Sequence, residues 1–263
     1  MKTQNAELTD LRHTLPANPL RPLGSVDRRL LRGAGLAGTV GSLLMLATFV
    51  LVSALGLPDP SAPESLLRFP EIQYARAAEN LLYLAAIVLW AVHHELLHRL
   101  LHDTAPVLST AARTLGALGT TVLAANALLN VATATMSQAY QQATEAERSV
   151  VVLAWQAAQG TMDALLVSGA LLLPAAILLF GIALRRGLSP ILGWGAVVVG
   201  TAGTAAVIVV VATSSPSTLI AVSILGALAF HLVAGIRWLR LSRSCRRHTM
   251  QDVRLVGSAR SAR

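Results

Sequence analysis

The chain has 263 residues, of which 54% are hydrophobic and only 13% are charged, and its mean hydropathy is +0.60. Soluble globular domains carry about a quarter charged residues, so this composition excludes an ordinary soluble domain and indicates a polytopic membrane protein. The net charge of +8 is typical of some nucleic-acid-binding proteins. Here the arginines lie beside apolar segments, so we expect the lipid bilayer as the partner and no nucleic acid.

Six apolar segments are each long enough to cross a bilayer, which takes about 20 residues. They run over about 34–55, 80–98, 114–134, 150–184, 191–212 and 219–239. A polar arm at 1–32, which we expect to be disordered and cytoplasmic, precedes them, and a basic tail at 242–263 follows. The sequence therefore predicts an all-α bundle of six transmembrane helices over 33–241, with no soluble catalytic domain.

Two local patterns add detail to this bundle. Gly35, Gly38 and Gly41 fall close to one face of the first span, which predicts close packing against a neighbouring helix. Thr144, followed three residues later by Glu147, matches a capping box and places the start of the fourth helix there.

Basic residues are divided unevenly between the two sides of the predicted bundle. Eighteen of the 21 flank the spans on the side of the two termini, and only Arg68, Arg76 and Arg148 lie on the other side. Because positive residues remain on the cytoplasmic side of a membrane, we expect both termini to be cytoplasmic.

The segment 93–102, which reads HHELLHRLLH, ends the second span. His94, Glu95 and His98 match H-E-x-x-H, in which two histidines one turn apart bind zinc and the glutamate activates a zinc-bound water. The polar side chains from His94 to residue 102 share one arc of the helix, from which His93 stands apart. This pattern predicts, as one alternative, a zinc-dependent intramembrane metallopeptidase with Glu95 as the catalytic base.

A zinc peptidase needs a third protein ligand, for which Asp163 and His231 are the candidates at membrane depth. A structural interpretation competes, because Glu95 and Arg99 are spaced as an i, i+4 ion pair and histidines suit a helix C-terminus. Haem ligation by His94 and His231 is a further possibility, since it needs two histidines at matched depth.

Polar residues also recur along one face of several spans. An ionisable group at membrane depth costs about 3 kcal/mol or more unless it is paired, which makes it a functional hypothesis. The alternative is hydrogen bonding between helices. Our leading hypothesis is a non-enzymatic protein, without a cofactor, that binds or moves a small solute through a polar interior. The candidate residues for this interior are Asn80, Asn126, Asn130, Gln156, Gln159, Asp163 and His231.

The start of the fifth span carries a short motif, Arg-x-Leu-x-Pro-x-Leu-Gly-Trp, at 186–194. It resembles a hallmark of a bacterial six-span integral membrane family catalogued only as a domain of unknown function, with Ser189 inserted between the leucine and the proline. The resemblance takes in the first span and the six-span layout, and covers roughly residues 30–240. It implies a multi-pass protein of the bacterial inner (plasma) membrane and no established activity, substrate or cofactor.

Overall fold

Six long helical segments form the structure and match the six predicted spans. The computed structural model describes residues 25–56, 64–186, 188–213 and 219–261, which contain helices and no strand. The helices are α2 (Ser25–Leu55), α3 (Glu64–Leu101), α4 (Pro106–Leu129), α5 (Ala132–Gln142), α6 (Glu145–Arg186), α7 (Pro190–Thr213) and α8 (Leu219–Ser261). Together α4 and α5 make up the third span, so six segments are long and apolar enough to cross a membrane. The predicted all-α, six-span architecture is confirmed.

Most of the helices extend beyond the bounds expected from hydropathy, as α3 does in beginning at Glu64 and not near residue 80. The two terminal helices do so into the predicted arm and tail. α2 begins at Ser25, within the predicted arm at 1–32, and α8 continues to Ser261, through most of the predicted tail at 242–263. Residues 1–24 lie outside the described part of the chain. The early start of α2 has a physical reason, because Leu31 continues the apolar face of the helix between arginines and is only 1% exposed.

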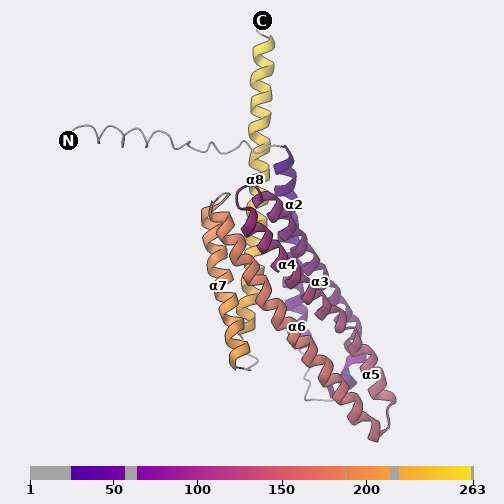
Figure 1. Cartoon of the computed structure of the whole chain (residues 1–263). Helices are drawn as coiled ribbons and strands as arrows, with labels where there is room; N and C mark the ends of the chain where they lie inside the picture. The colour runs from indigo at the N-terminus through magenta and orange to yellow at the C-terminus, as the bar shows by residue number, and fades with distance from the viewer. Residues whose placement is uncertain (1–24, 57–63, 187, 214–218, 262–263) are drawn as a thin grey trace, which may run out of the picture.

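The spans form a ring in which each one packs against its neighbours in the sequence (Figure 1). α2 packs on α3, α3 on α4, α4 on α6, α6 on α7 and α7 on α8, and α8 returns to pack on α2. Glycines close this ring: Gly35 of α2 lies so near Gly235 and Leu239 of α8 that a Cβ on Gly35 would come within 2.7 Å of the Leu239 side chain. The close packing predicted for this glycine face is confirmed.

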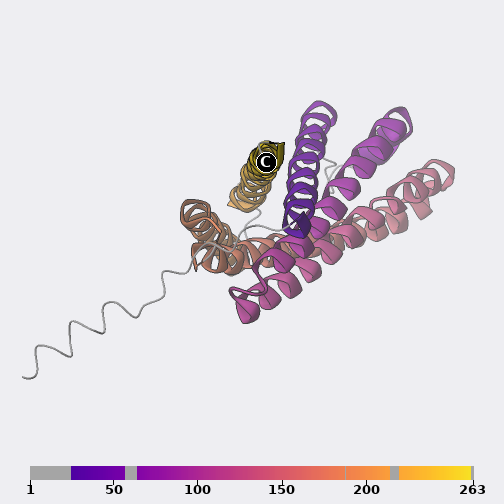
Figure 2. The ribbon, with the colours of Figure 1, turned by 90° about the horizontal axis from the view of Figure 1, so that it is seen from above.

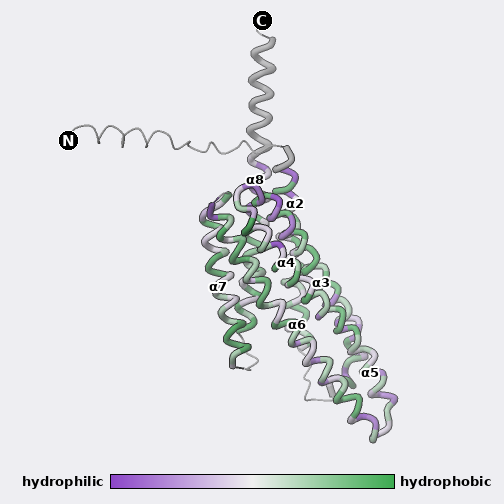
Figure 3. The backbone as a smooth tube through the Cα atoms, viewed as in Figure 1, coloured by the Kyte–Doolittle hydropathy of each residue, from purple (hydrophilic) through white to green (hydrophobic). Residues whose placement is uncertain are grey.

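The ring has two distinct ends. We call the end where α2 begins and α8 leaves the bundle the terminal end, and the opposite end the distal end (Figure 1). Hydrophilic residues gather at the terminal end and along the distal parts of α3, α5 and α6, while the ring between them is mainly hydrophobic (Figure 3). α3 and α6 have 38 and 42 residues, which makes them roughly 57 and 63 Å long. Both therefore exceed the hydrocarbon core of a bilayer, which is about 30 Å thick.

At the distal end, α3, α5 and α6 extend beyond α7 and α8 (Figure 1). A small separate core of Leu66, Tyr140 and Trp155 holds this extension together, and the Ser137 hydroxyl donates a 2.7 Å hydrogen bond to the Leu66 carbonyl. The predicted cap at the start of α6 is also present, since the Thr144 amide donates to the Glu147 carboxylate at 2.9 Å. Seen from above, α2, α3 and α6 spread away from one another (Figure 2).

Candidate functional site

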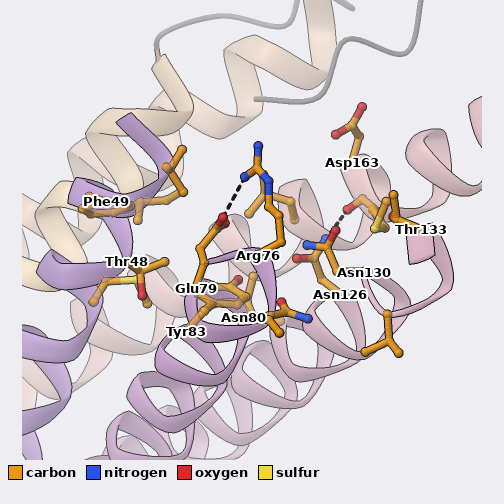
Figure 4. Close-up of a pocket in the computed structure, with 18 of the residues that line it drawn as sticks. Thr48, Phe49, Arg76, Glu79, Asn80, Tyr83, Asn126, Asn130, Thr133 and Asp163 are labelled. Atoms are coloured by element: carbon orange, nitrogen blue, oxygen red, sulfur yellow. Dashed lines mark hydrogen bonds and ion pairs between the residues drawn. The ribbon is translucent and has the colours of Figure 1, made fainter. Parts of the chain in front are cut away.

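A cavity of about 590 Å³ lies in the distal half of the ring, between the spreading helices (Figure 4). Its walls come from α2, α3, α4, α5, α6 and α8, whereas α7 contributes no lining residue. Five of the six spans therefore surround it. The volume falls within the range of about 300–1,000 Å³ that is typical of small-molecule sites.

One face of α3 runs the length of the cavity. Arg76, Asn80, Tyr83 and Trp90 recur at helical spacing on this face and all line the cavity. From Arg76 to Trp90 the helix rises by roughly 21 Å. At the distal rim Arg76 pairs with Glu79 at 2.7 Å (Figure 4) and donates to the carbonyl of Gly56 at the end of α2. The lining thus changes from charged at the rim, through neutral polar groups, to aromatic at the floor.

Two asparagines in the middle of the wall join neighbouring helices. The Asn80 amide of α3 donates to the Ala127 carbonyl of α4 at 2.7 Å, and the Asn126 amide of α4 donates to the Met162 carbonyl of α6 at 2.8 Å. The two amides form hydrogen bonds between helices, which is the structural role expected of polar groups in membrane spans. They line the cavity at the same time.

Three buried polar atoms of lining residues have no hydrogen-bond partner within the described chain. They are the Tyr83 hydroxyl, the Trp90 indole nitrogen and the Gln159 amide nitrogen. Buried polar groups in folded proteins are nearly always satisfied by protein or by ordered water, so unpartnered ones call for an explanation. Their position beside a cavity is consistent with hydrogen bonds to water or to a bound molecule.

Asp163 also lines the cavity, from α6 (Figure 4). Its side chain is exposed, and within the described residues no cationic side chain forms an ion pair with it. The hydrogen bond from Asn126 to α6 is accepted by the carbonyl of Met162, the residue directly before Asp163. Asp163 is therefore an unpaired carboxylate in the wall of an otherwise largely neutral cavity.

The floor of the cavity is the indole of Trp90, which stacks on the imidazole of His231 with ring centroids 4.4 Å apart and planes 12° apart. Beneath it lies a buried group of imidazoles that we call the histidine cluster: His93, His94 and His231. The ring centroids of His94 and His231 are 5.0 Å apart, and those of His93 and His231 are 5.2 Å apart. All three residues are at most 1% exposed.

Glycines on the two helices beside α3 make room for the histidine cluster. Gly38 of α2 lies directly against the His93 ring, and Gly116 of α4 lies directly against the His94 ring. The predicted polar arc does not separate a buried from an exposed face, because α3 is buried on two sides, by α2 and by α4, and His93, which stands apart from the arc, is buried as well. The predicted polar arc is divided instead, since His94 is buried while Arg99 is exposed.

Most of the residues predicted to form a polar interior line the cavity. Gln156 differs, because it is exposed on α6 and does not line the cavity. His231 lies beneath the floor, in the histidine cluster. The residues that do line the cavity are Asn80, Asn126, Asn130, Gln159 and Asp163.

The residues of the H-E-x-x-H pattern are engaged with other partners. Glu95 pairs with Arg99 at 2.9 Å and also with Arg113 of α4, while the Nδ1 atom of His98 lies 3.3 Å from the Ser109 hydroxyl of α4. In the described part of the chain, no group of three or more histidine, cysteine, aspartate or glutamate residues is arranged to hold a metal ion. The zinc hypothesis stays a prediction.

The haem hypothesis does not fit the direct contact between His94 and His231 in this conformation. The Nε2 atoms of His94 and His231 are 3.1 Å apart, so no porphyrin fits between the two rings as they stand. Of the two candidate third ligands for zinc, His231 contacts His94, whereas Asp163 belongs to the cavity wall.

Sequence reasoning missed Tyr83, Trp90 and His93 as site residues. A usable signal was present, because Tyr83 and Trp90 continue the face of α3 that carries Arg76 and Asn80. The sequence does not show that this face borders a cavity, since an aromatic residue at helical spacing is equally typical of a packed interface.

The motif at 186–194 has a local packing role. The Arg185 guanidinium lies 3.5 Å from the centroid of the Trp194 ring, and Gly193 packs against Gly181 of α6. Comparison with known proteins found no matching family model, no similar curated protein and no similar solved structure. Membership of the six-span family therefore stays a prediction, and the six apolar helices remain the basis for describing the chain as a multi-pass membrane protein.

Proposed function

We propose that this protein binds a small solute in the distal cavity and moves it through the bundle interior. The observation that carries the proposal is the cavity itself, about 590 Å³ in volume and surrounded by five of the six spans. Asn80, Asn126, Gln159 and Asp163 give it polar groups at positions where a helix that only had to pack or face lipid would carry apolar ones.

We further propose that both termini are cytoplasmic and that the membrane is the bacterial inner membrane. The orientation is supported by the charge of the two ends: arginines such as Arg32, Arg99 and Arg186 belong to the terminal end, while Arg68, Arg76 and Arg148 are the basic residues of the distal end. The cavity then belongs to the half of the protein that faces away from the cytoplasm.

Passage of a solute requires the floor to open. Trp90 stacks on His231, and beneath this pair the large side chains of Leu97, Phe180 and Trp238 are fully buried. The described conformation is therefore closed between the cavity and the terminal end. A rotation of Trp90 away from His231 is the smallest change that connects the cavity to the histidine cluster.

Native mass spectrometry of the protein released from nanodiscs tests solute binding without knowledge of the solute. We expect a co-purified small molecule on the wild type, and its loss in Leu166→Trp, which fills the cavity from α6. Leu153→Trp is the matched control, because Leu153 lies on the same helix, is 64% exposed and does not line the cavity. Equal occupancy of all three proteins, each with an unchanged melting temperature, would contradict the proposal.

A further inference from the structure

We infer that the solute of this cavity is a lipophilic cation, a molecule with a positive charge on a largely apolar body. This inference rests on the proposed function and names the chemical class of its ligand. It follows from the unpaired carboxylate in the cavity wall and from the apolar residues at the cavity floor.

Among the described residues that line the cavity, one charge is not neutralised. Its charged lining residues are Arg76, Glu79 and Asp163. Arg76 and Glu79 form a 2.7 Å ion pair in which both side chains are only 14% exposed, so their charges cancel at the rim. Asp163 has no such partner within the described residues. The described lining as a whole is therefore negative.

The position of Asp163 makes a cationic partner favourable. Asp163 is the one charged residue of α6 between Arg148 and Arg185, in a helix that is long and apolar enough to cross a bilayer. A carboxylate at membrane depth is costly unless it is paired or faces a polar space. A cation bound beside it supplies the missing pair, whereas a neutral ligand leaves the charge unpaired.

The inner part of the cavity is apolar and aromatic. On each of the five spans the lining residue nearest the terminal end is apolar or aromatic, and these residues form the floor: Met45, Trp90, Leu123, Leu173 and Ala227. An apolar body fits this floor through the hydrophobic effect. Tyr83 and Trp90 add aromatic rings, which attract cations as well as apolar groups.

An anionic ligand fits this lining poorly. Among the lining residues that the structure describes, the one cationic side chain is that of Arg76, which already binds Glu79 and the Gly56 carbonyl. An anion would have to displace those partners and would also be repelled by Asp163. The lining therefore discriminates by charge.

Tetraphenylphosphonium and tetraphenylborate test this discrimination, because they have the same shape and opposite charge. We expect isothermal titration calorimetry on the protein in nanodiscs to show saturable binding of tetraphenylphosphonium only. Asp163→Asn should weaken that binding about tenfold or more. The matched control is Glu71→Gln, since Glu71 is an exposed distal carboxylate outside the cavity lining and its loss should leave the affinity unchanged.

The variants separate the failure of this inference from the failure of the proposed function. If Leu166→Trp abolishes binding of tetraphenylphosphonium while Asp163→Asn does not weaken it, the cavity binds ligands but the assignment of Asp163 and of a cationic class is overturned. Binding of both ions with similar affinity, or of neither, also overturns the cationic class. Loss of the co-purified molecule in Leu166→Trp would still support the proposed function in each of these cases.

Discussion

His94 and His231 contact each other Nε2 to Nε2 at 3.1 Å, in the centre of the ring of helices. The Nδ1 atom of His231 lies 2.6 Å from the carbonyl oxygen of Ala227, which can only accept, so Nδ1 carries the proton. A neutral His231 then presents a lone pair at Nε2, and His94 donates its Nε2 proton to it. The contact thus fixes the tautomer of both rings. It also ties α3 to α8, which are not neighbours in the ring.

Replacement of His231 by leucine should destabilise the protein. The substitution leaves the buried Nε2 proton of His94 without an acceptor, at a cost of about 1–3 kcal/mol. We expect a lower free energy of unfolding in detergent titrations, and little change for His102→Ala, whose side chain is exposed. Because the two histidines share one hydrogen bond, the double substitution His94→Leu/His231→Leu should cost less than the sum of the single ones. Strict additivity would show that the contact contributes nothing.

Gly116→Ala should disturb the histidine cluster. A Cβ at this position would overlap the His94 ring, and such overpacking costs about 1–3 kcal/mol. Gly160→Ala is the matched control on another helix, because a Cβ there meets nothing within 4 Å and alanine favours a helix by about 1 kcal/mol over glycine. We expect melting temperatures that fall for Gly116→Ala and stay level or rise for Gly160→Ala. The opposite order would contradict the packing described here.

Metal content, measured by mass spectrometry on detergent-purified protein, tests the zinc hypothesis. With Glu95 held between Arg99 and Arg113, and with His98 beside Ser109, we expect little zinc in the wild type and no difference in His94→Ala/His98→Ala. Near-stoichiometric zinc that is lost in the double variant would establish a zinc site. Glu95→Gln should change the stability by less than about 1 kcal/mol, because the two arginines that pair with Glu95 are largely exposed.

Trp155→Ala should loosen the distal extension without opening the ring. Trp155 is only 1% exposed and packs with Leu66 and Tyr140, apart from the main core, so its truncation costs about 3–5 kcal/mol locally. Hydrogen–deuterium exchange should become faster in α5 and stay slow in α7. Leu153→Ala, on the exposed face of α6, should leave exchange in α5 unchanged. Uniformly faster exchange in every helix would show that the extension is not a separate unit.

Cysteine labelling in intact cells tests the orientation. In a Cys245→Ser background no other cysteine remains, so single cysteines can be introduced at Tyr74, which is 84% exposed in the distal half, and at Thr104, which is exposed at the terminal end. A membrane-impermeant maleimide should label Tyr74→Cys in intact cells and Thr104→Cys only after permeabilisation. The reverse pattern would place the termini outside.

Much of the architecture could be predicted because it depends on local properties of the chain. The length of each apolar segment decides whether it can cross a bilayer, and the six expected spans are the six found. The cap formed by Thr144 and Glu147 and the close-packing glycine face of α2 were equally local, since each needs only a fixed spacing along one helix.

The rotation of each helix about its axis could not be predicted in the same way. In a soluble protein the buried face of a helix is apolar and the exposed face is polar, but lipid is as apolar as a protein interior. Val198 and Val207 of α7 illustrate this point, because the first is 64% exposed and the second is fully buried. The residue type alone carries no information about which of the two faces the ring.

The sequence by itself therefore determined that the chain has six membrane-spanning segments, where their apolar parts lie, and how basic residues divide between their two sides. Only the tertiary structure decided that α8 closes the ring on α2, that His93 and His94 point to different neighbours, and that Asp163 borders a cavity. The reason is physical. Crossing the bilayer depends on each segment separately, whereas a cavity and a histidine pair depend on how helices far apart in the chain are turned toward one another.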